Sequence, residues 1–433
     1  MASILYRSHS TRCISRAAGF NGCITSTRRA FVDPRLTSRS GSLPSFVRSI
    51  SSQVSNDHIS KLDPILLRDA CRCSQCIDPS TQQREFVFSD IPIDIQVSSA
   101  QSTSSSGYEV RWTNDISGLN DHVSQYSNTD LQSIASRTLP QTKGRTEVEL
   151  WDRDIFSNKV SQSVDYQDLL GNTTSLSNAL NQFRAYGLIF VNNIPEDSEA
   201  VRHIVNRLAL LKNTFYGETW DVRSVPQAKN VAYTSKILGF HMDLLYMKEP
   251  PGVQLLHCIH NSCTGGESEF ADTFKAVEVL RYEQPEYVNL LCKSTIRYGY
   301  DNDNHFYTDE KPVIKLSQPA DARDANFMKY VERVYWSPPF IDTIATSTTT
   351  ANISGFVKAS KAFADILQRP EMIFETKMES GTCAVFDNLR VVHARKAFDM
   401  NSGKRWLKGV YGDYQDIFSK TVKHVDRRGC KTQ

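Results

Sequence analysis

The sequence has no run of about 18 consecutive apolar residues, so we expect no helix that crosses a membrane. It contains no P-loop, no Gly-rich dinucleotide turn and no His-Glu-x-x-His pair, the usual signatures of nucleotide-binding proteins and zinc hydrolases. A net charge of only +2 over 433 residues excludes a nucleic-acid-binding polycation. Ten cysteines are too few for a secreted disulfide scaffold of this size. What is left is an ordinary globular composition, long enough for two or three domains.

The first 48 residues differ in composition from the rest of the chain. They hold eight arginines, no lysine and a single acid, Asp33, among many serines and threonines. Arg-rich, Ser-rich and acid-poor composition is typical of an organellar transit peptide, so we predict that residues 1–50 direct the protein to the mitochondrial matrix. Two alternatives stay open, namely a disordered basic tail that binds an anionic partner and a cytoplasmic protein.

Two globular regions are expected beyond this segment, residues 51–145 and residues 146–433, with the boundary in the polar stretch 128–147. In the first region, alternation of apolar and polar residues predicts strands at 85–88, 91–97 and 108–112. The serine-rich residues 98–106 between them are interpreted as a polar loop.

The second region combines a few helices with many short strands. Hydrophobic periodicity predicts helices at 174–186, 196–213 and 355–369. Short apolar runs bounded by turn residues predict strands at 187–191, 253–259, 294–298, 312–316, 373–377, 383–387 and 408–411. This pattern indicates a mainly β fold with inserted helices, an α+β jelly roll or double-stranded β-helix, preceded by the smaller β domain.

A cluster of three cysteines, Cys71, Cys73 and Cys76, is the first motif that carries chemistry. Thiolates at this spacing converge on one soft metal ion, and tetrahedral zinc requires a fourth ligand. His122 is the nearest downstream candidate. A closed site with three cysteines and one histidine leaves no position for a substrate, so the predicted role is structural. A redox-active or merely buried thiol cluster is the alternative.

A second metal site is predicted from His241 and Asp243, which are two residues apart and so point the same way on a strand. His393 lies 150 residues after Asp243, just beyond the predicted strand 383–387. Two histidines and one carboxylate form the facial triad of non-haem Fe(II), which leaves positions open for a chelating co-substrate and O₂. Arg405 offers a guanidinium for the distal carboxylate of a keto-diacid. Taken singly, His393 is better explained as a core histidine and Arg405 as a surface charge.

Aromatic residues flank both parts of this triad. Tyr216, Trp220 and Tyr233 precede His241, and Tyr411 follows Arg405. Electron-rich ring faces gathered around one point bind a quaternary ammonium group. Packing in a β-rich core is the alternative interpretation of these rings.

Together these motifs resemble the γ-butyrobetaine dioxygenase and trimethyllysine dioxygenase family, within the wider taurine dioxygenase-like group. The resemblance covers nearly everything after the first 50 residues. The segments that carry it are 67–76, 230–234, 241–243, 250–259, 264–268, 386–393 and 405–414. The match at 67–76 resembles the family's zinc domain, and the others resemble its catalytic domain.

The resemblance implies a set of site residues. For zinc these are Cys71, Cys73, Cys76 and His122, and for Fe(II) they are His241, Asp243 and His393. Arg405 and Ser268 match positions for the 2-oxoglutarate co-substrate, with O₂ as the second co-substrate and ascorbate as a reductant. The positions matching the substrate pocket are Tyr216, Trp220, Asn230, Tyr233 and Tyr411. A homodimer is also implied.

The reaction implied by the resemblance is hydroxylation of a trimethylammonium acid, with γ-butyrobetaine converted to L-carnitine. Trimethyllysine hydroxylation is the alternative within the same chemistry, and a non-catalytic zinc-domain binding protein is the alternative from another class. The chain departs from the family at residues 335–339, which read Tyr-Trp-Ser-Pro-Pro. The butyrobetaine enzymes carry an asparagine-rich run there, which completes the site for the substrate carboxylate.

Overall fold

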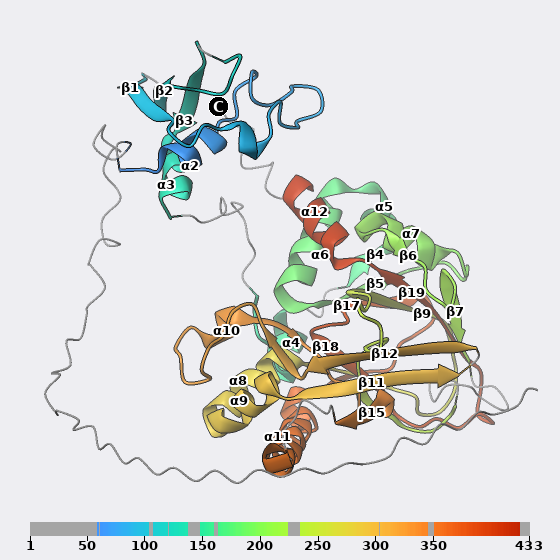
Figure 1. The fold of residues 1–433 in the computed structure, drawn as a ribbon. Helices are drawn as coiled ribbons and strands as arrows, with labels where there is room; N and C mark the ends of the chain where they lie inside the picture. Colours follow the sequence, from blue (N-terminus) through green and yellow to red (C-terminus); the bar gives the residue numbers. More distant parts are fainter. Residues whose placement is uncertain are drawn as a thin grey trace, which may run out of the picture. The chain divides into compact units, whose positions relative to one another are not determined.

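The computed structural model describes residue 59 and residues 61–103, 107–119, 121–136, 148–159, 163–223, 234–302, 304–344 and 350–424, except for the side chains of 136 and 350–352. The chain divides into two compact units after Thr138 (Figure 1). The predicted transit segment lies outside the described residues. No helix in the described ranges is long and apolar enough to cross a membrane.

The described residues of the N-terminal unit include a three-stranded antiparallel sheet and two short α-helices. Its strands, in sheet order, are β1 (Gln96–Ser102), β2 (Gly107–Thr113) and β3 (Val123–Ser127). Its helices are α2 (Pro64–Asp69) and α3 (Asn128–Ser136). Asp63 begins α2 by accepting hydrogen bonds from the backbone N–H groups of Ile65 and Leu66. Apolar side chains from the sheet and from α2 enclose a small core that includes Cys71 and Cys76.

Two expectations for this unit are wrong. Residues 85–88 form no strand, because only Phe86 packs into the core whereas Val87 and Phe88 are exposed and belong to no sheet of the described chain. Of the stretch 91–97, only the end belongs to β1, which then continues through the serine-rich residues to Ser102. This edge strand pairs with β2 through its backbone while several of its side chains face water, so polar residues are tolerated there.

The C-terminal unit contains two sheets of a jelly roll that share an apolar core, as expected from the sequence. The larger sheet has the order β4-β5-β17-β9-β19-β6, with β7 paired to β19. Its strands are β4 (Val164–Asp165), β5 (Leu188–Asn192), β6 (Leu211–Lys212), β7 (Thr219–Val222), β9 (Val253–Asn261), β17 (Thr382–Asp387) and β19 (Arg405–Gly412). The smaller sheet, β16-β10-β18-β8, consists of β16 (Phe374–Thr376), β10 (Ser268–Asp272), β18 (Val391–Arg395) and β8 (Leu238–His241).

Side-chain alternation along the strands separates two apolar layers. In β17, Cys383 and Val385 belong to a core shared with the outer helices, whereas Ala384 and Phe386 belong to the core between the sheets. The helices that complete the outer core are α5 (Tyr166–Gly171), α6 (Thr173–Tyr186), α7 (Ala200–Leu208) and α12 (Tyr414–His424). Because both faces of the larger sheet are covered, its strands appear in the sequence as nearly continuous apolar runs.

A third core lies beside the smaller sheet and contains the long insertion between β10 and β16. Its helices are α8 (Thr273–Glu283), α9 (Pro285–Lys293), α10 (Phe327–Tyr330) and α11 (Thr350–Leu367), while α4 (Arg153–Lys159) packs near β16. Its strands are β11 (Thr295–Asn302), β12 (His305–Pro312), β13 (Ile314–Leu316), β14 (Val331–Val334) and β15 (Ile341–Ile344).

Most of the predicted elements of this unit are present, with one clear error. The helix at 174–186 is confirmed: Asn172 caps its start, and Gly187 ends it with φ 70°, a left-handed conformation that glycine adopts easily. The predicted helix 196–213 is too long, because α7 ends at Leu208 and residues 211–212 form β6. Pairing of β6 with β19 outweighs the helical periodicity that continues through Leu211.

We predict that Arg390→Met lowers the free energy of unfolding by about 3–5 kcal/mol, because it leaves a buried carboxylate unpaired. Arg390 donates to both carboxylate oxygens of Asp272, at 3.1 and 2.8 Å, and both side chains are almost fully buried. Urea denaturation followed by circular dichroism measures the change. The control is Arg297→Met, which removes a half-exposed pair with Glu310 and costs less than about 1 kcal/mol. Equal losses in the two variants would contradict the prediction.

Candidate active site and metal sites

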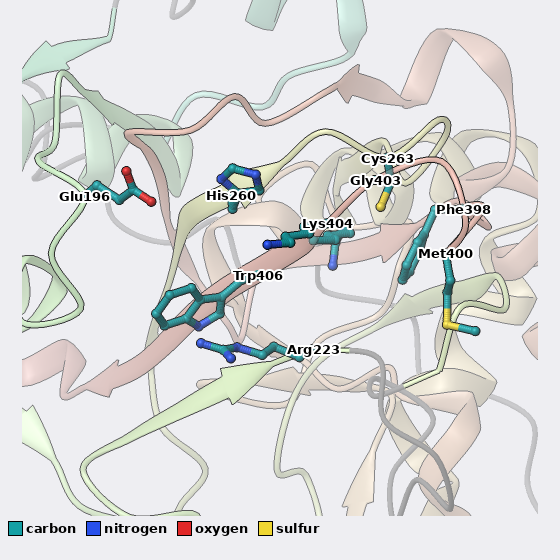
Figure 2. A pocket seen from close by; sticks show the side chains of 10 residues that line it. Glu196, Arg223, His260, Cys263, Phe398, Met400, Gly403, Lys404 and Trp406 are labelled. Atoms are coloured by element: carbon teal, nitrogen blue, oxygen red, sulfur yellow. The ribbon is translucent and has the colours of Figure 1, made fainter.

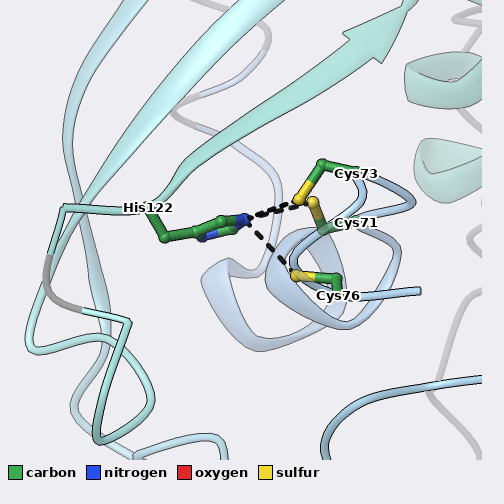
Figure 3. Close-up of side chains that lie close together, drawn as sticks. All are labelled: Cys71, Cys73, Cys76 and His122. Carbon is green, nitrogen blue, oxygen red and sulfur yellow. Dashed lines mark hydrogen bonds between the residues drawn. The ribbon is translucent and has the colours of Figure 1, made fainter. Parts of the chain in front are cut away.

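The three cysteines and His122 meet in the N-terminal unit as the sequence predicts (Figure 3). The Nε2 atom of His122 lies 3.4, 3.3 and 3.4 Å from the Sγ atoms of Cys71, Cys73 and Cys76. A tetrahedral zinc ion with ordinary Zn–S and Zn–N bond lengths sets a sulfur-to-nitrogen distance of about 3.5 Å. The donor set and its size therefore fit a structural zinc ion.

Two further side chains support this cluster. Asp115 Oδ2 lies 2.9 Å from Nδ1 of His122, which leaves Nε2 directed at the sulfur atoms. Arg68, which is fully buried, donates to Asp115 Oδ1 at 2.6 Å and to Cys76 Sγ at 3.3 Å. The guanidinium thus offsets negative charge that three thiolates would gather in a buried place.

The predicted iron ligands also come together, in the C-terminal unit. His241 ends β8, Asp243 follows two residues later, and His393 is the central residue of β18. Register pairs His393 with His241 across the two antiparallel strands, and their ring centroids lie 4.1 Å apart. One donor atom from each of the three residues lies within 4.8 Å of the others. Two nitrogens and one oxygen converging in this way fit a non-haem iron site.

Hydrogen bonds orient two of these ligands. Nδ1 of His241 donates to the carbonyl of Gly239 at 2.9 Å, so Nε2 keeps its lone pair for a metal. Asp243 Oδ1 lies 3.4 Å from that Nε2. Asp243 Oδ2 accepts from Gln254 Nε2 at 2.7 Å and from the Tyr411 hydroxyl at 2.8 Å.

The electrostatic environment puts these groups in the protonation states that a metal requires. Burial, and then the neighbouring His241, lower the pKa of His393 to about 3, so its imidazole is neutral. Burial alone would raise the pKa of Asp243, but the neighbouring His241 and His393 outweigh it and lower that pKa. Burial and the Asp243 carboxylate raise the pKa of Tyr411 well above its usual value, so the phenol stays a donor.

Arg405 and Ser268 line the same cavity as the triad, as does Trp220. Arg405 begins β19, and no carboxylate among the described residues lies within ion-pair distance of it. Its partly buried guanidinium, whose pKa is lowered by burial, is suited to an anion. Ser268 lies on β10 opposite Arg395 of β18, whose side chain also lines the cavity.

A second pocket shares Arg405 with this cavity (Figure 2). Arg223 lies under the indole ring of Trp406, with its guanidinium carbon 3.6 Å from the ring centroid, and Lys404 lies just before the start of β19. Among the described lining residues, Glu196 is the one acid facing these cations. The pocket therefore favours anions near Arg405.

The predicted aromatic set is brought together in part. Trp220 stacks on Tyr411 with centroids 4.0 Å apart, and Tyr216 lies 6.3 Å from Trp220. A side chain at Gly409 would overlap the indole of Trp220, so this glycine lets the indole lie against the backbone of β19. Tyr233 and Asn230 lie outside the described residues.

Comparison with known proteins identifies the family. Residues 152–411, more than half of the chain, match the family described as taurine catabolism dioxygenase TauD, TfdA family. The chain belongs to the TauD/TfdA family. It is therefore an Fe(II)- and 2-oxoglutarate-dependent dioxygenase, and the expectation of a non-catalytic binding protein is not retained. Residues 48–131 match the N-terminal domain described as gamma-butyrobetaine hydroxylase-like.

Relatives within the TauD/TfdA family differ in their names. Dioxygenase str8 of Strobilurus tenacellus is 34% identical, covering 80% of this chain and 81% of that protein. Gamma-butyrobetaine dioxygenase of Pseudomonas sp. (strain AK-1) is 28% identical over 89% of this chain and 96% of that protein. Human mitochondrial trimethyllysine dioxygenase is 27% identical over 83% of this chain and 82% of that protein. Similarity therefore fixes the reaction type and not the substrate.

Sequence reasoning missed four residues that contact either the predicted iron ligands or the zinc cluster. These are Gln254, Asn388, Arg68 and Asp115. Gln254 carried a usable signal, since it is a polar residue inside an apolar run and proves almost fully buried, as does Asn388. A buried amide requires a partner, which marks such positions for attention.

We predict that Asp115→Asn weakens zinc binding by the N-terminal unit about 10- to 100-fold, because an amide has one acceptor oxygen where the two carboxylate oxygens of Asp115 serve three donors, from Arg68, Ile116 and His122. Competition with a chromophoric chelator measures zinc affinity. Asp69→Asn, which alters a more exposed carboxylate paired with Arg84, is the control and keeps the affinity of the unchanged protein. Zinc retention by Asp115→Asn equal to that of the control would rule out the orienting role.

Proposed function

We propose that this chain hydroxylates a small substrate that carries a trimethylammonium group. The observation that supports it most is that one cavity is lined by His241, Asp243, His393, Arg405 and Trp220. Metal donors, a cation for an acidic co-substrate and an aromatic ring for a cationic substrate thus share one space. Each of these features also occurs singly in proteins without such a reaction, whereas their convergence in one cavity is what this reaction type requires.

In this proposal His241, Asp243 and His393 hold Fe(II), and Arg405 and Ser268 bind 2-oxoglutarate. The bound metal, with 2-oxoglutarate and O₂, supplies the oxidising chemistry that hydroxylates an unactivated carbon, while the co-substrate becomes succinate and CO₂. Arg405 pairs with the distal carboxylate of the co-substrate, and the Ser268 hydroxyl donates to the same anion. The neutral imidazole of His393 and the lowered pKa of Asp243 keep protons off the ligand atoms.

The substrate end of the proposal depends on aromatic rings. Trp220 lines the cavity of the triad and Tyr216 lies 6.3 Å from Trp220, and a trimethylammonium group held against such rings gains up to about 2 kcal/mol per ring when desolvated. With γ-butyrobetaine the product is L-carnitine. Trimethyllysine is the second candidate, favoured by residues 335–339, which lack the asparagines of the butyrobetaine enzymes.

The mitochondrial matrix remains the proposed location. The Arg-rich composition of residues 1–48 supports it, and the human trimethyllysine dioxygenase to which this chain is similar carries the word mitochondrial in its name.

We expect the full chain, supplied with Fe(II) and 2-oxoglutarate, to form succinate in the presence of γ-butyrobetaine or trimethyllysine. Parallel assays of succinate and of hydroxylated product separate the two substrates.

His393→Ala should lower turnover at least about 100-fold, and Arg405→Lys should raise the KM for 2-oxoglutarate about 10-fold, since lysine cannot bind a carboxylate bidentately. Absence of succinate with every trimethylammonium acid tested would refute the proposed substrate class.

Gly409→Ala tests the aromatic part of the site, because the added methyl group displaces Trp220. We expect the KM for the trimethylammonium substrate to rise about 10-fold, with the KM for 2-oxoglutarate unchanged, as expected from the loss of one cation–π contact. Gly171→Ala is the matched control, since a methyl group there meets no atom within 4 Å. If both variants show the same KM values as the unchanged protein, Trp220 does not contact the substrate.

A further inference from the structure

The two carboxylate oxygens of Asp243 have different surroundings. Oδ1 lies 3.4 Å from the Nε2 atom of His241, which keeps its lone pair, and accepts from no donor among the described residues. Oδ2 accepts two short hydrogen bonds, from Gln254 and from Tyr411. Since both donors are neutral and approach the same oxygen, they fix the rotation of the carboxylate about its Cβ–Cγ bond.

The position of Tyr411 on its strand, together with its burial, holds its hydroxyl beside Asp243 Oδ2. It lies on β19 between Val410, which packs toward the outer helices, and Gly412. Its side chain is 2% exposed, and one face of the ring is covered by Trp220 at 4.0 Å. With so little freedom, the hydroxyl can reach few partners, and the one it reaches is a predicted metal ligand.

Gln254 reaches the same oxygen from the neighbouring strand. Residues 254 and 411 are paired across β9 and β19, so their side chains leave the sheet side by side on its inner face. Gln254 is 1% exposed, and its amide nitrogen is the atom that faces the carboxylate. A register pair of the larger sheet therefore holds a ligand that belongs to the loop after β8.

We propose that Tyr411 and Gln254 are positioning residues that hold Asp243 Oδ2 away from the metal, so that Asp243 binds through Oδ1 alone. A carboxylate that binds through one oxygen leaves more of the coordination sphere for co-substrate and O₂ than one that binds through both. The hydroxyl of Tyr411 performs this role, whereas its ring supports Trp220. The inference rests on the proposed assignment of Asp243 as an iron ligand.

Removing the Tyr411 hydroxyl changes the hydrogen bonds of Asp243 and, through them, the affinity for the metal. Oδ2 loses one of the two donors that hold it and keeps the Gln254 amide alone among the described residues. The carboxylate then turns more freely, so metal affinity falls, by about 10- to 100-fold as for other outer partners of metal ligands. The Tyr411→Phe ring still stacks on Trp220, so aromatic contacts to a substrate are kept.

The test is a titration of the full chain with Mn(II), which needs neither O₂ nor substrate, with free Mn(II) followed by electron paramagnetic resonance. Tyr411→Phe and Gln254→Leu are compared with Tyr298→Phe, another buried tyrosine that loses one hydrogen bond, here to the carbonyl of Tyr335 at 3.0 Å. Melting temperatures of all variants show whether each is folded. Gln254→Leu provides an independent measurement if Tyr411→Phe is poorly folded.

The expected result is a Kd for Mn(II) raised at least 10-fold in Tyr411→Phe and in Gln254→Leu, and unchanged within about 2-fold in Tyr298→Phe. Folded Tyr411→Phe and Gln254→Leu that bind Mn(II) as tightly as Tyr298→Phe would overturn the inference. Because the titration contains no substrate, failure of the proposed substrate class appears only in the turnover assays. Weakened Mn(II) binding together with inactivity toward trimethylammonium acids would keep the inference and reject that class.

Discussion

The metal site depends on the pairing of two strands, β8 and β18, which come from distant parts of the chain. In an antiparallel pair, residues directly opposite each other point to the same face, so the register that pairs His241 with His393 brings two imidazoles together. A slip of one residue would turn one imidazole to the opposite face of the sheet. The central position of β18 prevents this, because β10 also pairs with it and places Phe270 opposite His393.

Asp243, the third ligand, lies beyond the end of β8, so strand pairing does not fix its position. The buried side chain of Asn388 accepts from the backbone N–H of Asp243 at 2.8 Å and donates to its carbonyl at 2.9 Å. The next residue, Leu244, has φ 62°, an unfavourable conformation for a branched side chain. Such strain of about 1–3 kcal/mol persists only where surrounding contacts enforce it, and here the contacts of Asn388 do so beside a functional residue.

Sequence reasoning found what is local and missed what depends on register. The strand 383–387 and the helix 174–186 follow from periodicity and end signals, and the iron triad followed from His241, Asp243 and a later histidine joined to a family resemblance. The hydrogen bond between Tyr411 and Asp243 joins residues 168 positions apart through pairing that no local pattern encodes. The serine-rich edge strand was missed for the opposite reason, because backbone pairing requires no apolar side chain.

Main-chain contacts beside the metal ligands do not depend on residue type, unlike side-chain contacts. Residues 335–339, where the sequence departs from the butyrobetaine enzymes, contact the main chain between His241 and Asp243: the carbonyl of Trp336 accepts from Met242 N–H at 2.9 Å. The carbonyl of Tyr335 likewise accepts from the Tyr298 hydroxyl. Because carbonyl groups are common to every residue type, these two hydrogen bonds do not depend on which side chains stand at 335 and 336. The main-chain support between His241 and Asp243 can therefore persist where the sequence of this segment differs.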